Sequence, residues 1–291
     1  MGDAVPVRDA STIMVVRDAK DGAGIEVLML RRNARSAWVG GAHLFPGGAV
    51  DADDGSEETV AFCAGRSDEE ASRLLGVERG GRGFFVAAVR ECYEEAGLLL
   101  ANGPDGPLSF EDPAVAARFE EWRRRLNRHE TRLADICRAE SLTLALDTLG
   151  YFSHWITPEG SPRRYDTRFF VAVVPDGQTA LHDDSEVVDS TWIRPEEALA
   201  RHREGTIDMM FPTVKNLEAI ARFERAGDVV AAAAAAEVPT VLPRISVEGP
   251  GVRILLPGDE GYEEATGLPK GAQFPDLPSR MRPQPGTEGA G

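Results

Sequence analysis

Three glutamates lie close together in the segment 90–95 (RECYEE). On a helix, Glu91, Glu94 and Glu95 are related by steps of three and four residues, so their carboxylates share one side. Like charges placed together cost stability unless a cation holds them, and hard divalent ions such as Mg²⁺ prefer oxygen ligands. The spacing therefore favours a site for Mg²⁺ or Mn²⁺, an ion that can bridge diphosphate oxygens and lower the pKa of a bound water. The simpler alternative is a solvated acidic helix face with an Arg90–Glu94 ion pair, and the glutamates alone would favour it.

A helix within the segment 83–100 is expected to position these side chains. Its apolar residues recur at helical spacing, and they are Phe85, Ala88, Val89, Cys92 and Ala96. Gly97 is well placed to end the helix. The three carboxylates lie off this apolar stripe, so the helix can bury one side and present the acids on another.

The segments around this helix predict a mixed sheet. Residues 11–17 and 25–31 are β-branched and apolar and are joined by a glycine-containing turn, which predicts an antiparallel strand pair. A short strand from Leu44 is broken at Pro46. Residues 51–82 are acidic and glycine-rich, with one helical stretch at 68–76, and are interpreted as an insertion.

The second half of the chain alternates helical and extended patterns. We expect helices at 113–127 and 131–147, strands at 150–157, 166–174 and 187–194, and helices after Pro195, at 213–226 and through the alanines ending near Glu237. Residues 239–256 could add a hairpin, and the chain from about 267 onward is expected to be disordered. This order of elements predicts a mixed sheet covered by helices on both faces.

Composition restricts the class of partner. The net charge of −16 argues against a nucleic-acid polymer. No run approaches the roughly 18 apolar residues of a membrane span, and the N-terminus has no secretory signal pattern, so a cytoplasmic protein is expected. The arginine-rich segment 118–138 is more simply explained as a solvated helix face, or as a contact in a homodimer, than as a surface that steers substrate.

The segment from Arg90 to Leu98 resembles the second half of the Nudix box, Arg-Glu-apolar-x-Glu-Glu-x-Gly-apolar, at each fixed position. The first half, a glycine followed six residues later by an acid, is matched by Gly48 and Asp54. Two departures stand out: Asp54 replaces a glutamate, and 35 residues separate the halves where the usual box has seven. A loop can absorb this length because the cost of closing a loop grows slowly with its length.

The resemblance implies roles for individual residues. Glu94 and Glu95 would be the main metal ligands, Glu91 a ligand or general base, and Arg90 would hold a glutamate in place. The backbone carbonyl of Gly48 would complete the coordination, and glycine at 47 and 48 lets the backbone approach metal and phosphate closely. A further acid is usual in the family, and Glu186 is the candidate. The equal alternative is that residues 183–189 are only an acidic segment at the start of a strand.

A second set of residues bears on the substrate. Leu28, Arg32, Gly41 and 45–48 (FPGG) partly match the stretch before the box in coenzyme A-cleaving Nudix enzymes. Residues 10–226 resemble the peroxisomal acyl-CoA diphosphatase branch more closely overall, including the segment 162–170 (PRRYDTRFF). Arg32, Arg163, Arg164 and Arg168 are therefore candidates to bind phosphate, with a surface salt bridge an equal alternative for each.

These observations predict an α/β protein with a Nudix-type α/β/α sandwich, a mixed β-sheet, a helical insert and a C-terminal extension. The Nudix domain would span 8–226, with inserts at about 55–82 and 105–148, followed by an extension at 227–266 and a tail at 267–291. The expected activity is Mg²⁺- or Mn²⁺-dependent cleavage of CoA or acyl-CoA to 3′,5′-ADP and (acyl-)phosphopantetheine. The alternatives are another nucleoside diphosphate derivative, such as ADP-ribose, NADH or a nucleotide sugar, and a non-catalytic ligand-binding regulator.

Overall fold

The computed structural model describes residues 5–33, 40–181, 187–248 and 251–265. Its largest element is a mixed sheet with the strand order β11-β2-β1-β10-β9-β12, to which β3 adds beside β2 and β4 beside β1. The strands are β1 (Val7–Asp18), β2 (Ile25–Arg32), β3 (His43–Leu44), β4 (Gly47–Ala49), β9 (Gly150–Ile156), β10 (Arg164–Val173), β11 (Val187–Ile193) and β12 (Thr240–Val241). The pairs β1–β10 and β9–β12 are parallel and the others antiparallel, which confirms the predicted mixed sheet.

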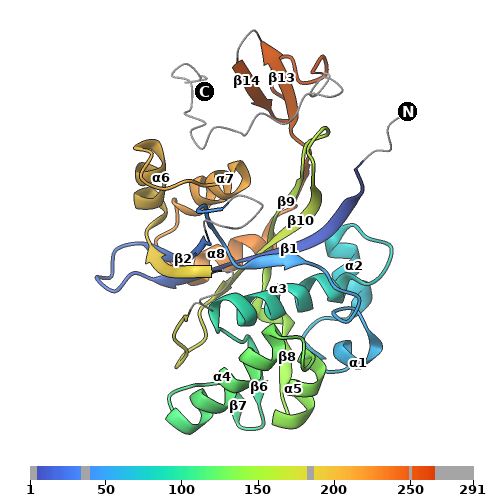
Figure 1. Ribbon diagram of the computed structural model, residues 1–291, viewed down its shortest axis with the longest axis vertical. Helices are drawn as coiled ribbons and strands as arrows, with labels where there is room; N and C mark the ends of the chain where they lie inside the picture. Colours follow the sequence, from blue (N-terminus) through green and yellow to red (C-terminus); the bar gives the residue numbers. More distant parts are fainter. Residues whose placement is uncertain (1–4, 34–39, 182–186, 249–250, 266–291) are drawn as a thin grey trace.

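Alternating side chains of β1 fill two separate cores, one on each face of the sheet. Ile13 and Val15 pack on the side of helix α3 (Gly81–Ala96). Met14 and Val16 pack on the opposite side, which is covered by α6 (Pro195–Arg203), α7 (Phe211–Ile220) and α8 (Ala226–Ala235). Because successive side chains of a strand point to opposite faces, one apolar strand serves both layers. Figure 1 shows the resulting α/β/α arrangement, and the predicted fold class is confirmed.

The two segments expected as inserts form one additional layer against α3. The first contains α1 (Glu57–Val60), β5 (Cys63–Ala64) and α2 (Asp68–Leu75), and the second contains β7 (Gly106–Pro107), α4 (Pro113–Asn127), α5 (Leu133–Glu140) and β8 (Thr143–Ala145). With β6 (Ala101–Gly103) they build a small sheet in the order β5-β8-β6-β7. Segments far apart in sequence therefore meet below α3 (Figure 1).

Two predicted helices are shorter than expected. The helix expected over 131–147 ends at Glu140, because Ser141 takes a left-handed conformation (φ 53°) and the buried Leu142 and Leu144 then continue into strand β8. A short 3₁₀ turn, Leu146–Thr148, follows. The helix expected over 213–226 ends at Ile220, and α8 begins separately at Ala226.

The chain after α8 returns to the sheet and then leaves it. Strand β12 joins the edge of the main sheet beside β9. The predicted hairpin is confirmed as β13 (Arg244–Glu248) paired with β14 (Gly251–Leu255), beyond the tip of the β9–β10 hairpin (Figure 1). The expected disordered tail, 267–291, lies outside the described residues. No described helix is both long and apolar enough to span a bilayer.

Candidate active site on helix α3

The site forms where the double-glycine strand β4 meets α3. Gly48 pairs with Ser11 of β1, and the Gly47 amide donates a 2.9 Å hydrogen bond to Oε2 of Glu95. A Cβ built on Gly48 would lie 2.4 Å from Oε1 of Glu91, closer than real Cβ contacts. A side chain at this position would therefore displace the Glu91 carboxylate. The structure places the glycine turn and the glutamate helix side by side, as the sequence predicted.

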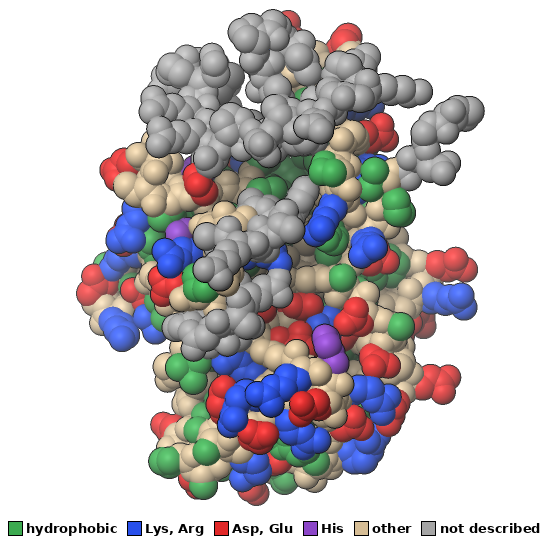
Figure 2. Space-filling model, in the orientation of Figure 1, with side chains coloured by type: hydrophobic (Ala, Val, Ile, Leu, Met, Phe, Trp, Pro, Cys, Tyr) green, Lys and Arg blue, Asp and Glu red, His purple; other side chains and the backbone are tan. Residues whose placement is uncertain are grey.

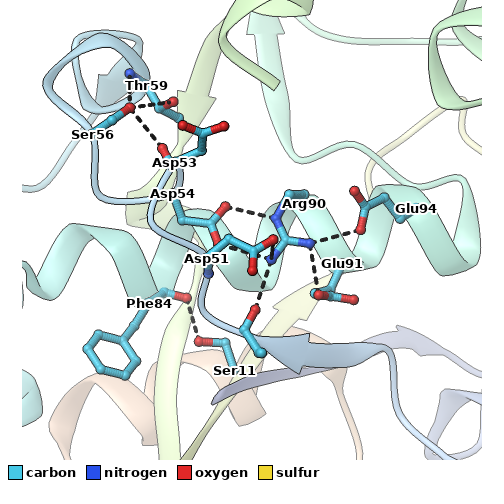
Figure 3. Close-up of polar contacts among 11 residues, drawn as sticks. Ser11, Asp51, Asp53, Asp54, Ser56, Thr59, Phe84, Arg90, Glu91 and Glu94 are labelled. Carbon is cyan, nitrogen blue, oxygen red and sulfur yellow. Dashed lines mark hydrogen bonds and ion pairs between the residues drawn. The ribbon is translucent and has the colours of Figure 1, made fainter. Parts of the chain in front are cut away.

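Arg90 is the hub of this site (Figure 3). Its Nε and Nη2 donate to the two carboxylate oxygens of Asp54 at 2.8 and 2.9 Å, and Nη2 also donates to the carbonyl of Ala49 at 2.9 Å. Its Nη1 donates to Glu91 and Glu94 at 2.8 and 2.9 Å. A guanidinium has five N–H donors, and each is matched to an acceptor here. Arg90 thus holds two of the three predicted ligands, Glu91 and Glu94, in fixed positions.

Asp54 has a larger structural part than the sequence suggested. Its side chain is only 2% exposed, and one oxygen also accepts from the Asp51 amide at 2.8 Å. Because Asp54 stands where the Nudix box has a glutamate, only a weak supporting role was predicted for it, and the long interval before Arg90 left its alignment open. The intervening residues fold back tightly: Gly83 at the start of α3 packs against Gly55, where a Cβ would lie 3.2 Å from the Gly55 Cα. The interval therefore does not displace Asp54 from Arg90.

The charges around Arg90 do not balance. Among the described residues, four carboxylates lie within ion-pair distance of this one guanidinium, and they belong to Asp51, Asp54, Glu91 and Glu94. Burial raises the pKa of Glu91 to about 7; Arg90 opposes this rise and the neighbouring Glu94 adds to it. Burial is also the main cause that raises the pKa of Glu94. A partly buried site with surplus carboxylates disfavours its own ionised state until more positive charge arrives.

The donor set fits a hard divalent cation. Every side-chain ligand here is a carboxylate oxygen, and Mg²⁺ and Mn²⁺ favour oxygen. The glycine at position 48, whose Cβ would overlap Glu91, leaves the backbone open toward the carboxylates. In the described part of the chain no three acidic, histidine or cysteine side chains are already grouped around one ion position. Arg90 Nη1 binds the carboxylates of Glu91 and Glu94, and the Gly47 amide binds that of Glu95.

The structure places three of the predicted phosphate-binding arginines at the end of β2 or around the start of β10. Arg163 precedes β10, and Arg164 opens that strand and donates from Nε to the carbonyl of Thr157 at 3.1 Å. Arg164 pairs with Val7, whereas Gly48 pairs with Ser11, so they are separated by roughly 13 Å along the sheet. Arg32 ends β2, beside the strands that lead into the glycine turn. Glu186, the candidate fourth acid, lies outside the described residues.

Arg168 takes the salt-bridge alternative. Its side chain is 5% exposed and forms ion pairs with Asp166 at 3.0 Å and Asp9 at 3.3 Å. Its guanidinium also stacks on Phe84 of α3, 4.4 Å from the ring centroid. His154 hydrogen-bonds to Asp166 on the other side. Arg168 is therefore buried in a cluster with acidic partners, of which Asp9 is 59% exposed.

The arginines of segment 118–138 mostly meet acids at the surface. Arg118 pairs with Glu140, and Arg132 and Arg138 share Glu58. Figure 2 shows basic and acidic side chains intermixed over the lower part of the molecule, around α4 and α5. This pattern agrees with the solvated helix face that the sequence favoured, and a dimer contact there stays a prediction.

One arginine of this segment differs from the others, and the sequence did not predict a role for it in the site. Arg123 is 2% exposed and donates to the backbone carbonyls of Glu94 and Glu95 at 3.0 and 3.1 Å. Asn127, one turn later, also donates to the Glu94 carbonyl at 3.2 Å. The contact joins residues almost thirty positions apart, and no pattern of nearby residues predicts it.

Comparison with known proteins gives one consistent result. The sequence profile of the NUDT19 Nudix domain matches residues 80–220. The chain is 30% identical over 276 residues to the acyl-coenzyme A diphosphatase NUDT19 of Gallus gallus, covering 82% of this chain and 73% of that protein. It is 28% identical to the Homo sapiens protein of the same name, covering 83% and 73%.

Among solved structures, a Nudix hydrolase from Alicyclobacillus acidocaldarius is 25% identical, with a TM-score of 0.61. The match covers 78% of this chain and 96% of that one. Sequence, fold and the geometry around Arg90 agree. The chain belongs to the Nudix pyrophosphohydrolases, in the group that the NUDT19 proteins represent.

Proposed function

We propose that this enzyme hydrolyses the diphosphate bond of CoA or an acyl-CoA, giving 3′,5′-ADP and (acyl-)phosphopantetheine. Water adds to one phosphorus, the bridging P–O bond breaks, and the bridging oxygen leaves with the second phosphate. The observation that carries the proposal is the surplus of carboxylates on α3 beside the Gly47–Gly48 turn. The substrate class is supported by the vertebrate relatives, which bear the name acyl-coenzyme A diphosphatase.

Glu91, Glu94 and Glu95, with the carbonyl of Gly48, are the groups that would hold Mg²⁺ or Mn²⁺. When bound, such an ion supplies positive charge for the diphosphate oxygens and favours ionisation of water. Arg90 keeps the carboxylates of Glu91 and Glu94 on the same side of the helix. Glu91 is a ligand or the general base, and Glu186 is the alternative base.

Arginines outside the cluster would recognise the remaining phosphate of the substrate. CoA carries a 3′-phosphate in addition to its diphosphate, and planar guanidinium groups bind phosphate through paired hydrogen bonds. Arg163 and Arg164, at the tip of the β9–β10 hairpin, stand away from α3, where a second phosphate of an extended substrate could reach them. Arg32, beside the glycine turn, would serve the diphosphate itself.

Turnover of CoA, a short and a long acyl-CoA, NADH and ADP-ribose, each with Mg²⁺ and with Mn²⁺, tests the proposal. We expect the CoA series to be preferred, with 3′,5′-ADP as product by chromatography. Glu94→Gln should lower turnover at least about 100-fold, because a ligand is lost. Glu121→Gln, an exposed acid paired with Arg124 on α4, is the matched control and should leave turnover unchanged.

Preference for a substrate outside the CoA series would overturn the substrate assignment. An inactive wild-type protein across the whole panel, with ligand binding retained, would instead indicate a regulatory module.

A further inference from the structure

Helix α3 ends inside the protein, so its last carbonyls need partners there. The final four carbonyl groups of an α-helix receive no hydrogen bond from an N–H group of the same helix, and leaving them buried without a donor is costly. Gly97 closes the helix in a left-handed conformation (φ 70°), and its amide donates to the Tyr93 carbonyl at 3.0 Å. The Leu181 amide donates to the Ala96 carbonyl at 2.9 Å. Two carbonyls of the last turn remain, and they belong to Glu94 and Glu95.

Arg123 of α4 binds both of these carbonyls. Its Nε donates to the Glu94 carbonyl at 3.0 Å and its Nη2 to the Glu95 carbonyl at 3.1 Å, and Asn127 adds a second donor to Glu94 at 3.2 Å. The residues whose backbones are held in this way are two of the three glutamates proposed to bind the ion. One guanidinium therefore fixes the backbone from which both carboxylates project.

The burial of Arg123 is hard to explain by packing alone. Its side chain is 2% exposed, yet its carboxylate partner, Glu120, lies 3.5 Å away and is itself 40% exposed. A buried guanidinium whose carboxylate partner is largely solvated is unfavourable unless other negative charge is nearby. The C-terminal end of α3 carries the negative end of the helix dipole, and the carboxylate cluster lies one turn behind it. Arg123 is thus a buried positive charge placed against the electronegative end of the glutamate helix.

The contact between the two helices is reciprocal. The hydroxyl of Tyr93, on α3, donates to the carbonyl of Phe119 on α4. A Cβ built on Gly97 would lie 3.2 Å from Nη1 of Arg123, so the chain leaving α3 runs directly along the guanidinium. Helix α4 therefore both donates hydrogen bonds to the last turn of α3 and accepts one from it.

We propose that Arg123 is a positioning residue for the ion-binding glutamates, through which the helical insert becomes part of the catalytic apparatus. It acts by fixing the carbonyls of Glu94 and Glu95 and by offsetting negative charge at that end of α3. The effect of Arg123 on turnover rests on the proposed function. Its direct effect is on ion binding, which can be measured separately.

Mn²⁺ binding, followed by electron paramagnetic resonance of the free ion, tests the proposal without any substrate. Arg123→Met should weaken Mn²⁺ binding about 10- to 100-fold, the usual effect of losing a group that orients ligands. Arg123→Lys keeps the charge but loses the two-carbonyl fork, and should fall between Met and wild type. Arg124→Met is the matched control, since Arg124 is 54% exposed on the same helix, and it should bind Mn²⁺ like wild type.

Turnover with saturating Mn²⁺ should recover part of the loss in Arg123→Met, because the weakened step is binding. Unchanged Mn²⁺ affinity in folded Arg123→Met and Arg123→Lys, with only a lower melting temperature, would overturn the proposal. If Arg123→Met does not fold, Arg123→Lys and Asn127→Ala carry the same test, and wild-type affinity in both overturns it. If Mn²⁺ affinity depends on Arg123 as proposed but the wild-type protein cleaves no acyl-CoA, only the proposed function is refuted.

Discussion

Two buried arginines, Arg90 on α3 and Arg168 beside it, organise polar clusters that differ in one respect. Arg168 lies between Asp166 and Asp9, with His154 bonded to Asp166, so acidic and basic groups are nearly matched. Arg90 faces four carboxylates among the described residues. A balanced cluster needs nothing further, whereas a surplus of buried negative charge costs stability that a bound cation can offset. The difference separates an arrangement that serves the fold from one that serves chemistry.

Replacing the two arginines should give the largest contrast. Arg90→Met leaves Asp54 buried without its cation and should lower the free energy of unfolding by about 3–5 kcal/mol and abolish turnover. Arg168→Met should cost less, about 1–3 kcal/mol, because its partner Asp9 is 59% exposed, and should leave the folded protein active. Urea denaturation and turnover of both variants check this. Similar losses of activity in the two would remove the distinction between the clusters.

A smaller change can be made at the glycine that faces Glu91. In Gly48→Ala the new Cβ would fall 2.4 Å from Oε1 of Glu91, and the flexible carboxylate must move away. We expect stability to change by less than about 1 kcal/mol but turnover to fall about 10- to 100-fold, as ligand orientation is lost. Gly227→Ala in α8 meets no atom within 4 Å and should leave turnover unchanged. Full activity in Gly48→Ala would show that the Gly48–Glu91 contact is dispensable.

The smallest effect concerns the balanced cluster and pH. Burial alone would raise the pKa of Asp166, but the His154 hydrogen bond and the Arg168 guanidinium together hold it below its usual range. A lowered folded-state pKa adds stability above the unfolded value, about 3.9, and this is lost as pH falls through the folded value. Asp166→Asn should therefore cost about 1 kcal/mol at pH 7 and close to nothing once the pH is below the folded-state pKa of Asp166. A difference independent of pH would contradict the ionic role.

The fold and the centre of the site could be predicted because their signals are local. The steps between Glu91, Glu94 and Glu95 follow from helix geometry, and the glycines at 47 and 48 have no side chain to obstruct them. The β-branched and apolar residues of β1 predicted a strand, although not that both of its faces would be buried. The early end of α5 depends on the left-handed conformation of Ser141 and on the pairing of β8 with β5 and β6, which come from other parts of the chain.

Contacts between distant segments could not be predicted in this way. Asp54 meets Arg90 across 36 positions and Arg123 meets Glu94 across 29, and nothing near either residue encodes its partner. Arg163, Arg164 and Arg168 were grouped by their closeness in sequence. In the structure, Arg163 and Arg164 lie at the tip of the β9–β10 hairpin, whereas Arg168 is buried and ion-paired. Charge type alone does not distinguish an arginine that binds phosphate from one that supports the sheet.

The central claim is that the surplus of carboxylates around Arg90 is a divalent-ion site. Its most direct test is calorimetric titration of Mn²⁺ into the wild type, Glu94→Gln and Asp166→Asn. Saturable binding to the wild type, weakened at least about tenfold in Glu94→Gln and unaltered in Asp166→Asn, is the predicted result. Absence of binding to the wild type, or equal weakening by changes in both clusters, would contradict it.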